Sequence, residues 1–96
     1  DWIDSYESTF GNLPNIGSAY GYMYMDITAK ALEIAGRDLT TDSFLNALES
    51  INDYKIPFGD TILSWSPEKH LGANVAYLFE VQNGAFMQID NKEYTY

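Results

Sequence analysis

The sequence predicts a mixed α/β fold in which three helices precede a strand and a β-hairpin. Apolar residues recur at helical spacing in three segments between residues 2 and 51. From about residue 61 the period changes to two. The dipeptide Asn83-Gly84, which favours a two-residue type I′ turn, separates two apolar runs near the end of the chain.

The first helix is expected over residues 2–10. Trp2, Ile3, Tyr6 and Phe10 stand at helical spacing, and Gly11 follows them. Glycine is the common residue just beyond a helix end because it adopts a left-handed backbone without steric cost. We therefore expect the helix to end at this glycine.

The second helix is expected to be capped by Ser18 and ended by Gly36. Its apolar residues form two rows: Tyr20, Tyr24, Ile27, Ala31 and Ile34, and then Tyr22, Met25, Ala29 and Leu32. The charged residues share one narrow stripe and offer two pairs at spacing i,i+4, Asp26 with Lys30 and Glu33 with Arg37. No charge precedes Asp26, so the first two turns are expected to face protein or a cleft.

The third helix is expected after Thr40, a plausible N-cap. Asp42 lies in its first turn, where the helix dipole favours an anion. The apolar spacing predicts a buried face of Phe44, Leu45, Leu48 and Ile51.

The remaining chain is expected to form strands. Thr61, Leu63 and Trp65 alternate with other residues on one face. The Asn83-Gly84 turn predicts a hairpin register that pairs Val81 with Phe86, Phe79 with Gln88, and Glu80 with Met87. The polar tail, residues 90–96, is expected to fray.

Composition limits the possible partners. The 96 residues include 14 acidic and 5 basic side chains, giving a net charge of −9. Such a surface repels nucleic acid and anionic membranes, and plain solubility explains the charge best. No apolar run approaches the roughly 20 residues that span a bilayer. Both ends of the chain look cut, which suggests a segment of a longer, processed protein.

No motif indicates catalysis, a metal site or a cofactor. There is no cysteine, and His70, the single histidine, is expected on a surface turn. Nucleophile-elbow and phosphate-binding glycine motifs are absent. The lack of any catalytic signature argues against an enzyme.

The tyrosine-rich stretch from Gly17 to Asp26 could be helix core or the wall of a ligand cleft. Tyr24 and Met25 continue into the apolar rows and are expected in the core. Tyr20 and Tyr22 stand in the first turns, where free backbone N–H groups attract acceptors and tyrosine offers flat apolar area with a hydroxyl. For these two residues both interpretations remain open.

The order of these motifs resembles the C-terminal part of type I periplasmic solute-binding proteins of ABC importers, above all those for branched-chain amino acids and amides. The similarity lies in "WIDSYESTFGNLPN", "AYGYMYMDITAKALEIAG", "LTTDSFLNALES" and "IPFGDTILSWSPEKHLGANVAYLFEVQNGAFMQI". It covers nearly all 96 residues. The family often has Tyr-Asp after the first turn of the second helix, whereas this chain has Tyr22-Met23.

The resemblance implies a fold of two α/β lobes that close on a solute about a hinge. Residues 1–60 would belong to one lobe, and residues 61–96 to the hinge and the second lobe. It also implies a solute such as an amino acid, amide or carboxylate, no cofactor, a membrane permease as partner, and a periplasmic or extracellular location, with a lipid anchor in Gram-positive or archaeal cells. The implied ligand contacts are Ser18, Ala19, Tyr20 and Tyr22.

Most ligand-gripping residues of the family lie upstream of such a segment, so the resemblance implies that an N-terminal part of the same protein completes the site. On its own the chain would expose apolar surface and could oligomerise. Two other roles are considered: a sensor ectodomain or regulator of the same fold, and a self-contained interaction domain.

Overall fold

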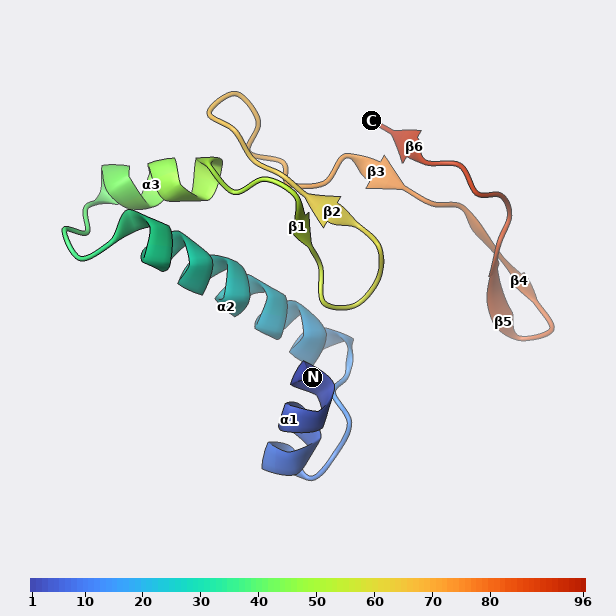
Figure 1. Ribbon diagram of the computed structural model, residues 1–96. Helices are drawn as coiled ribbons and strands as arrows, with labels where there is room; N and C mark the ends of the chain where they lie inside the picture. Colours follow the sequence, from blue (N-terminus) through green and yellow to red (C-terminus); the bar gives the residue numbers. More distant parts are fainter.

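The computed structural model describes all 96 residues (Figure 1). Three helices come first: α1 (Trp2–Phe10), α2 (Ile16–Ala35) and α3 (Thr41–Glu49). Six short strands follow: β1 (Tyr54–Lys55), β2 (Ile62–Leu63), β3 (Val75–Ala76), β4 (Phe79–Gln82), β5 (Ala85–Gln88) and β6 (Tyr94–Thr95). They form three two-stranded antiparallel sheets, β1–β2, β3–β6 and β4–β5. The mixed α/β class with three leading helices is confirmed.

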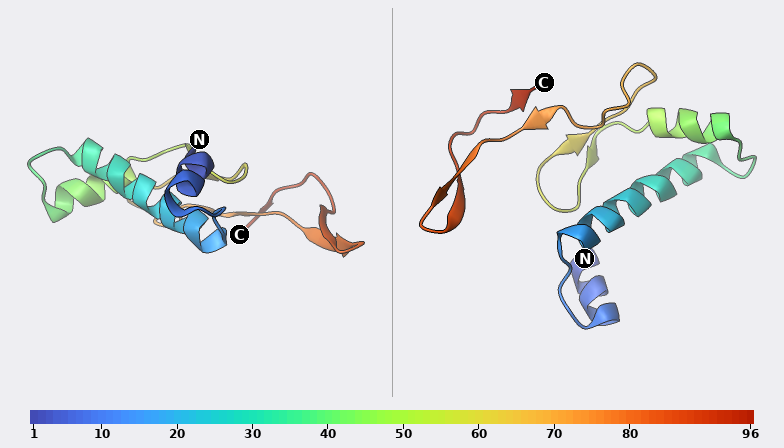
Figure 2. Two further views of the ribbon diagram at one scale, coloured as in Figure 1. Left: turned by 90° about the horizontal axis from the view of Figure 1, so that it is seen from below. Right: turned by 180° about the vertical axis from the view of Figure 1, so that it is seen from behind.

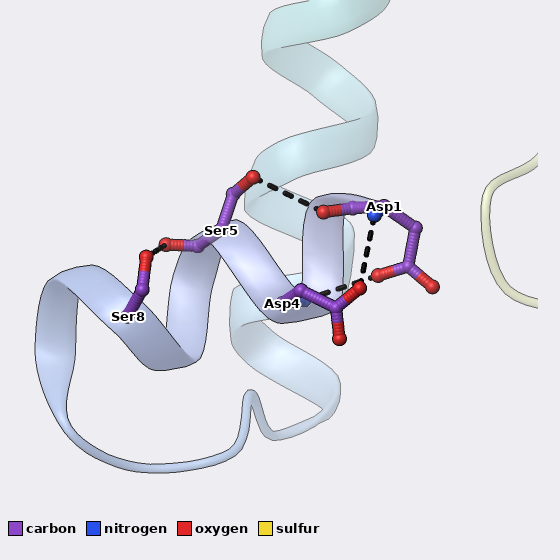
Figure 3. Close-up of polar contacts among 4 residues, drawn as sticks. All are labelled: Asp1, Asp4, Ser5 and Ser8. Carbon is purple, nitrogen blue, oxygen red and sulfur yellow. Dashed lines mark hydrogen bonds and ion pairs between the residues drawn. The ribbon is translucent and has the colours of Figure 1, made fainter.

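Helix α1 is closed at both ends by local hydrogen bonds. The Asp1 carboxylate accepts the Asp4 N–H at 3.0 Å, and the Asp4 carboxylate accepts from the Asp1 amine, also at 3.0 Å (Figure 3). This reciprocal pair is a capping box. Ser5 and Ser8 each donate a hydroxyl hydrogen bond to a carbonyl one turn earlier. Gly11 ends the helix with φ of 73°, as expected.

Helix α2 begins earlier than the sequence pattern predicted, so the expectation that Ser18 caps it is wrong. Asn15 is the N-cap, and its side-chain oxygen accepts the Ser18 N–H at 3.0 Å. Ser18 therefore lies inside the first turn. Asparagine and serine are comparable caps, and the pattern could not rank them. Gly36 ends the helix as predicted.

The buried side of α2 also differs from the prediction. Its buried residues form a row four apart: Ala19, Met23, Ile27 and Ala31. Tyr24 and Met25, which were expected in the core, are 60% and 66% exposed. The reason is that α3 and the β1–β2 hairpin cover only one side of α2, and these two side chains point elsewhere. Of the two expected charged pairs, Asp26 and Lys30 lie 4.0 Å apart, whereas no ion pair joins Glu33 to Arg37.

Helix α3 packs against the C-terminal half of α2 (Figure 1). Thr40 caps it as predicted: its hydroxyl accepts the Ser43 N–H at 3.0 Å, and the Ser43 hydroxyl accepts the Thr40 N–H at 2.9 Å. Ala47 is buried and allows the two helices to approach closely. Leu45 is 43% exposed, so its place in the predicted buried face is wrong. The inward row is Phe44, Ala47, Leu48 and Ile51.

The β1–β2 hairpin completes the core. Leu63 is buried and Ile62 is exposed, as the predicted alternation requires, and Tyr54 pairs with Leu63 across the hairpin. Trp65 packs against this core and lies directly over Gly72. A Cβ atom at Gly72 would approach the indole ring to 2.6 Å. The Trp65 ring can therefore occupy this position only because glycine has no side chain.

The predicted β-hairpin forms with the predicted register. Val81 pairs with Phe86, Phe79 with Gln88 and Glu80 with Met87. Asn83 and Gly84 adopt φ of 51° and 78°, the two positive values that a type I′ turn requires. The tail does not fray, contrary to expectation, because β6 pairs with β3 and joins Tyr94 to Ala76.

The molecule is open and flat. Its Cα radius of gyration is 16.6 Å, whereas a compact chain of this length has about 12 Å. The β4–β5 hairpin extends away from the helices in every view (Figure 2). Only eight residues are buried, all of them apolar, and Phe86 is 80% exposed. The chain thus leaves much apolar surface uncovered.

Candidate functional site

The four residues implied as ligand contacts lie in the first two turns of α2, and the structure distributes them over different sides. Ala19 faces inward and is 6% exposed. Ser18 is half-buried, and its hydroxyl donates a 3.0 Å hydrogen bond to the Tyr6 hydroxyl, which links α2 to α1. Tyr20 and Tyr22 are 44% and 43% exposed. Two of the four side chains are therefore open to solvent.

Each exposed tyrosine is held by another aromatic ring. Tyr22 stacks on Trp2 of α1, with ring centres 4.9 Å apart and planes 21° from parallel. Tyr20 meets Phe58, in the β1–β2 loop, edge to face at 5.3 Å. Such pairs hold the rings in place without using their hydroxyl groups.

The hydroxyls of Tyr20 and Tyr22 have no partner in the chain. The tyrosine hydroxyls that do form hydrogen bonds are those of Tyr6, Tyr54, Tyr77, Tyr94 and Tyr96. The backbone N–H groups of Ile16 and Gly17 are also free, because the Asn15 side chain reaches only Ser18. This end of α2 thus offers both donors and flat apolar surface.

Sequence reasoning missed Trp2 and Phe58 as neighbours of these tyrosines. Trp2 has the spacing of an ordinary core residue, and Phe58 lies in a loop without any periodic pattern. The Trp2 indole N–H donates to the carbonyl of Pro57, the residue before Phe58, at 3.4 Å. No sequence signal relates residues that are 55 positions apart.

A hollow of about 550 Å³ adjoins Tyr22. Its walls come from one side of α1 and the start of α2: Asp1, Trp2, Ser5, Tyr6, Thr9, Phe10 and Tyr22. The volume falls within the range of small-molecule pockets in proteins. A second hollow, of about 600 Å³, lies between the β1–β2 loop and the β4–β5 hairpin, with Phe58 and Tyr77 among its lining residues.

A polar cluster joins α2 to β1. The Tyr54 hydroxyl donates to the Asp26 carboxylate at 2.7 Å, and the Lys30 amine lies 6.0 Å from the centre of the Tyr54 ring. Burial, and then the bond to Asp26, raises the pKa of Tyr54 above its ordinary value. This hydroxyl therefore stays protonated and serves packing.

His70 is exposed, as expected, but it has a partner. Its Nε2 lies 2.8 Å from Oε1 of Glu49 in α3, whose side chain is only 12% exposed. This contact ties the turn after β2 to α3. The structure contains no group of three or more His, Cys, Asp or Glu side chains arranged to hold a metal ion. None of its helices has both the length and the apolar character needed to cross a membrane.

Comparison with known protein families identifies the chain. Residues 1–85 match the family model described as "Periplasmic binding protein". Comparison with curated proteins and with solved structures gave no match. The family match confirms the resemblance found in the sequence, and this family is typically non-enzymatic. The chain therefore belongs to the periplasmic binding protein family, whose members are solute-binding receptors that work outside the cytoplasm.

Proposed function

We propose that this chain forms part of the binding site for an amino acid or a related amide or carboxylate, which the protein delivers to the permease of an ABC importer. Binding between two lobes would close them about a hinge, and the permease would recognise the closed form. Residues 1–60 would belong to one lobe, and residues 61–96 to the hinge and the other lobe. The proposal combines family membership with the free groups at the start of α2.

The pair of exposed tyrosines is the observation that supports the site best. Both rings are braced by other aromatics, while both hydroxyls remain free. A braced ring loses little entropy when a solute packs on it, so more of the contact energy becomes affinity. In this proposal Tyr22 packs on the solute, and Tyr20 donates to or accepts from one of its polar groups.

The other two implied residues take supporting roles. Ser18 is engaged with Tyr6 and Asn15, so it would hold α1 against α2 and contact the solute through its oxygen lone pairs. Ala19 is buried, so its small side chain would let the backbone approach. The free N–H groups of Ile16 and Gly17 would favour a carboxylate or carbonyl oxygen of the solute.

Further protein surface is needed to enclose a solute. The exposed apolar side chains of α2 and of the β4–β5 hairpin exceed what a folded monomer usually leaves uncovered. We infer that another part of the same protein covers them and supplies the remaining ligand contacts.

A thermal-shift screen tests the proposal. The complete protein that carries this chain is heated with single amino acids, amides and small carboxylic acids. A compound that binds only the native state raises the melting temperature by mass action. We expect at least one of these classes to give a dose-dependent rise. If none does, while the protein shows a cooperative transition, the proposed function is wrong.

A further inference from the structure

The geometry points to the hollow between α1 and the start of α2 as the subsite for the side group of the solute, and to an aromatic ring as the group that fits it. This inference rests on the proposed function. It assigns to Trp2, outside the implied contact residues, the role of deciding which solutes bind.

The walls of the hollow are mainly aromatic rings. Trp2 and Tyr22 stack nearly parallel on each other, and Tyr6 and Phe10 lie 4.6 Å apart at 45°; all four rings line the hollow. A third ring entering this space would pack against the outer faces and edges of these two pairs, stacked or edge to face. These are the two arrangements that aromatic rings prefer, whereas an aliphatic group gains only the burial of its surface.

Apart from the Tyr22 hydroxyl, the hydroxyl groups of the lining are already engaged in hydrogen bonds. Ser5 donates to the Asp1 carbonyl at 3.1 Å, and Thr9 donates to the Ser5 carbonyl at 2.8 Å. The Tyr6 hydroxyl accepts from Ser18, and the Asp1 carboxylate accepts the Asp4 N–H. Beside the Tyr22 hydroxyl, a polar side group would therefore find few free partners in the hollow, which selects against it.

The acidic residue at the edge strengthens this selection. A solute carboxylate would be repelled by Asp1 and would instead favour the free N–H groups at the start of α2. The site thus separates the two ends of the solute: its polar head at the helix start and its ring in the hollow.

Trp2 is the residue that controls the hollow. It contacts Tyr22 face to face, and its indole N–H is fixed by the Pro57 carbonyl. Leucine at this position would keep apolar bulk without a ring, whereas phenylalanine would keep a ring of smaller area. These two substitutions separate aromatic contact from simple filling of space.

The test measures dissociation constants in the complete protein for matched pairs of compounds that differ only in aromaticity. The pairs are phenylalanine with cyclohexylalanine, and benzamide with cyclohexanecarboxamide. We expect the aromatic member to bind about tenfold more tightly. Trp2→Leu should remove this preference, and Trp2→Phe should keep most of it. Ile3→Ala, on α1 but outside the hollow, should leave it unchanged.

Each result bears on the inference. Equal affinity for the two members of a pair, or a preference that survives Trp2→Leu, overturns it while the proposed function stands. The same holds if the thermal-shift screen finds solutes but neither pair binds. If no compound of any class binds the folded protein, the inference and the proposed function fail together.

Discussion

The Tyr54 hydroxyl donates a 2.7 Å hydrogen bond to the Asp26 carboxylate and thereby ties strand β1 to the middle of α2. Tyr54 is buried, and Lys30 lies beside both partners, 4.0 Å from the carboxylate and 6.0 Å from the ring centre. The contact joins residues 28 positions apart and fixes how the β1–β2 hairpin sits on the helix. The same position of the β1–β2 hairpin brings Phe58 into contact with Tyr20.

The first prediction concerns alkaline pH. Burial and the bond to Asp26 raise the pKa of Tyr54, so the folded state keeps a proton that the unfolded state loses near pH 10. The free energy of unfolding should therefore be insensitive to this group below pH 10 and should fall as the pH rises further. Melting temperatures between pH 8 and pH 11 measure the effect, and Tyr54→Phe should reduce the decline.

Tyr77→Phe provides the matched control. The hydrogen bond to Glu93 raises the pKa of Tyr77 as well, but this pair lies in water at the surface. Its removal should change the alkaline decline less than Tyr54→Phe does. A Tyr54→Phe variant that follows the unchanged protein at every pH would show that the bond to Asp26 adds nothing to stability.

The second prediction tests which side of α2 is buried. Met23 is 6% exposed and Met25 is 66% exposed on the same helix. Met23→Ala should lower the free energy of unfolding by about 2–5 kcal/mol, because it leaves a cavity in the core. Met25→Ala should lower it less than Met23→Ala does, because no neighbour within residues 1–96 buries the Met25 side chain. Urea titrations of both variants measure this, and equal losses would mean that both sides of α2 are packed in the complete protein.

The third prediction concerns Gly72. Alanine there would force Trp65 to move, because its Cβ would lie 2.6 Å from the ring. We expect Gly72→Ala to lower the free energy of unfolding by about 1–3 kcal/mol and to shift the tryptophan fluorescence. Gly21→Ala is the control, because nothing lies within 4 Å of a Cβ at that helical position and alanine favours helix. A tolerated Gly72→Ala would contradict the described position of the indole ring.

The fourth prediction concerns the chain in isolation. With eight buried residues and exposed rows on α2 and the β4–β5 hairpin, residues 1–96 alone should associate or bind a hydrophobic dye. Analytical ultracentrifugation over a range of concentrations measures the association. A stable monomer with a cooperative unfolding transition would favour a self-contained domain and would argue against the two-lobed arrangement.

The elements that local chemistry determines were predictable from the sequence. Gly11, Thr40 and the Asn83-Gly84 turn each act within a few residues of themselves, and the structure confirms all three. The side on which α2 packs was not predictable, because Tyr24 and Met25 are as apolar as Met23. Only the neighbours that α3 and β1–β2 supply decide which row is covered. The expectation that the tail frays was wrong for the same reason. The sequence of residues 90–96 is polar and does not indicate that β6 pairs with β3, about 20 residues away.

The candidate site, too, was predictable only in the features that depend on local sequence. The sequence places Tyr20 and Tyr22 in the first turns of α2 but leaves both the core and the cleft interpretation open for them. Their bracing by Trp2 and Phe58 depends on how α1 and the β1–β2 loop fold back, and no spacing in the sequence encodes it. Ser18 shows that even a local feature can be assigned to the wrong residue: it was expected to cap α2, but Asn15 is the N-cap.

The affinity of the complete protein for its solute, measured by calorimetry in three tyrosine variants, tests the central claim most directly. Tyr20→Ala and Tyr22→Ala should each weaken binding about tenfold or more with a small change in melting temperature. Tyr96→Ala, outside α2 and 76% exposed, should leave the affinity unchanged. If all three variants bind alike, or if Tyr20→Ala and Tyr22→Ala lose stability while their affinity holds, the start of α2 is packing surface and the proposed site is wrong.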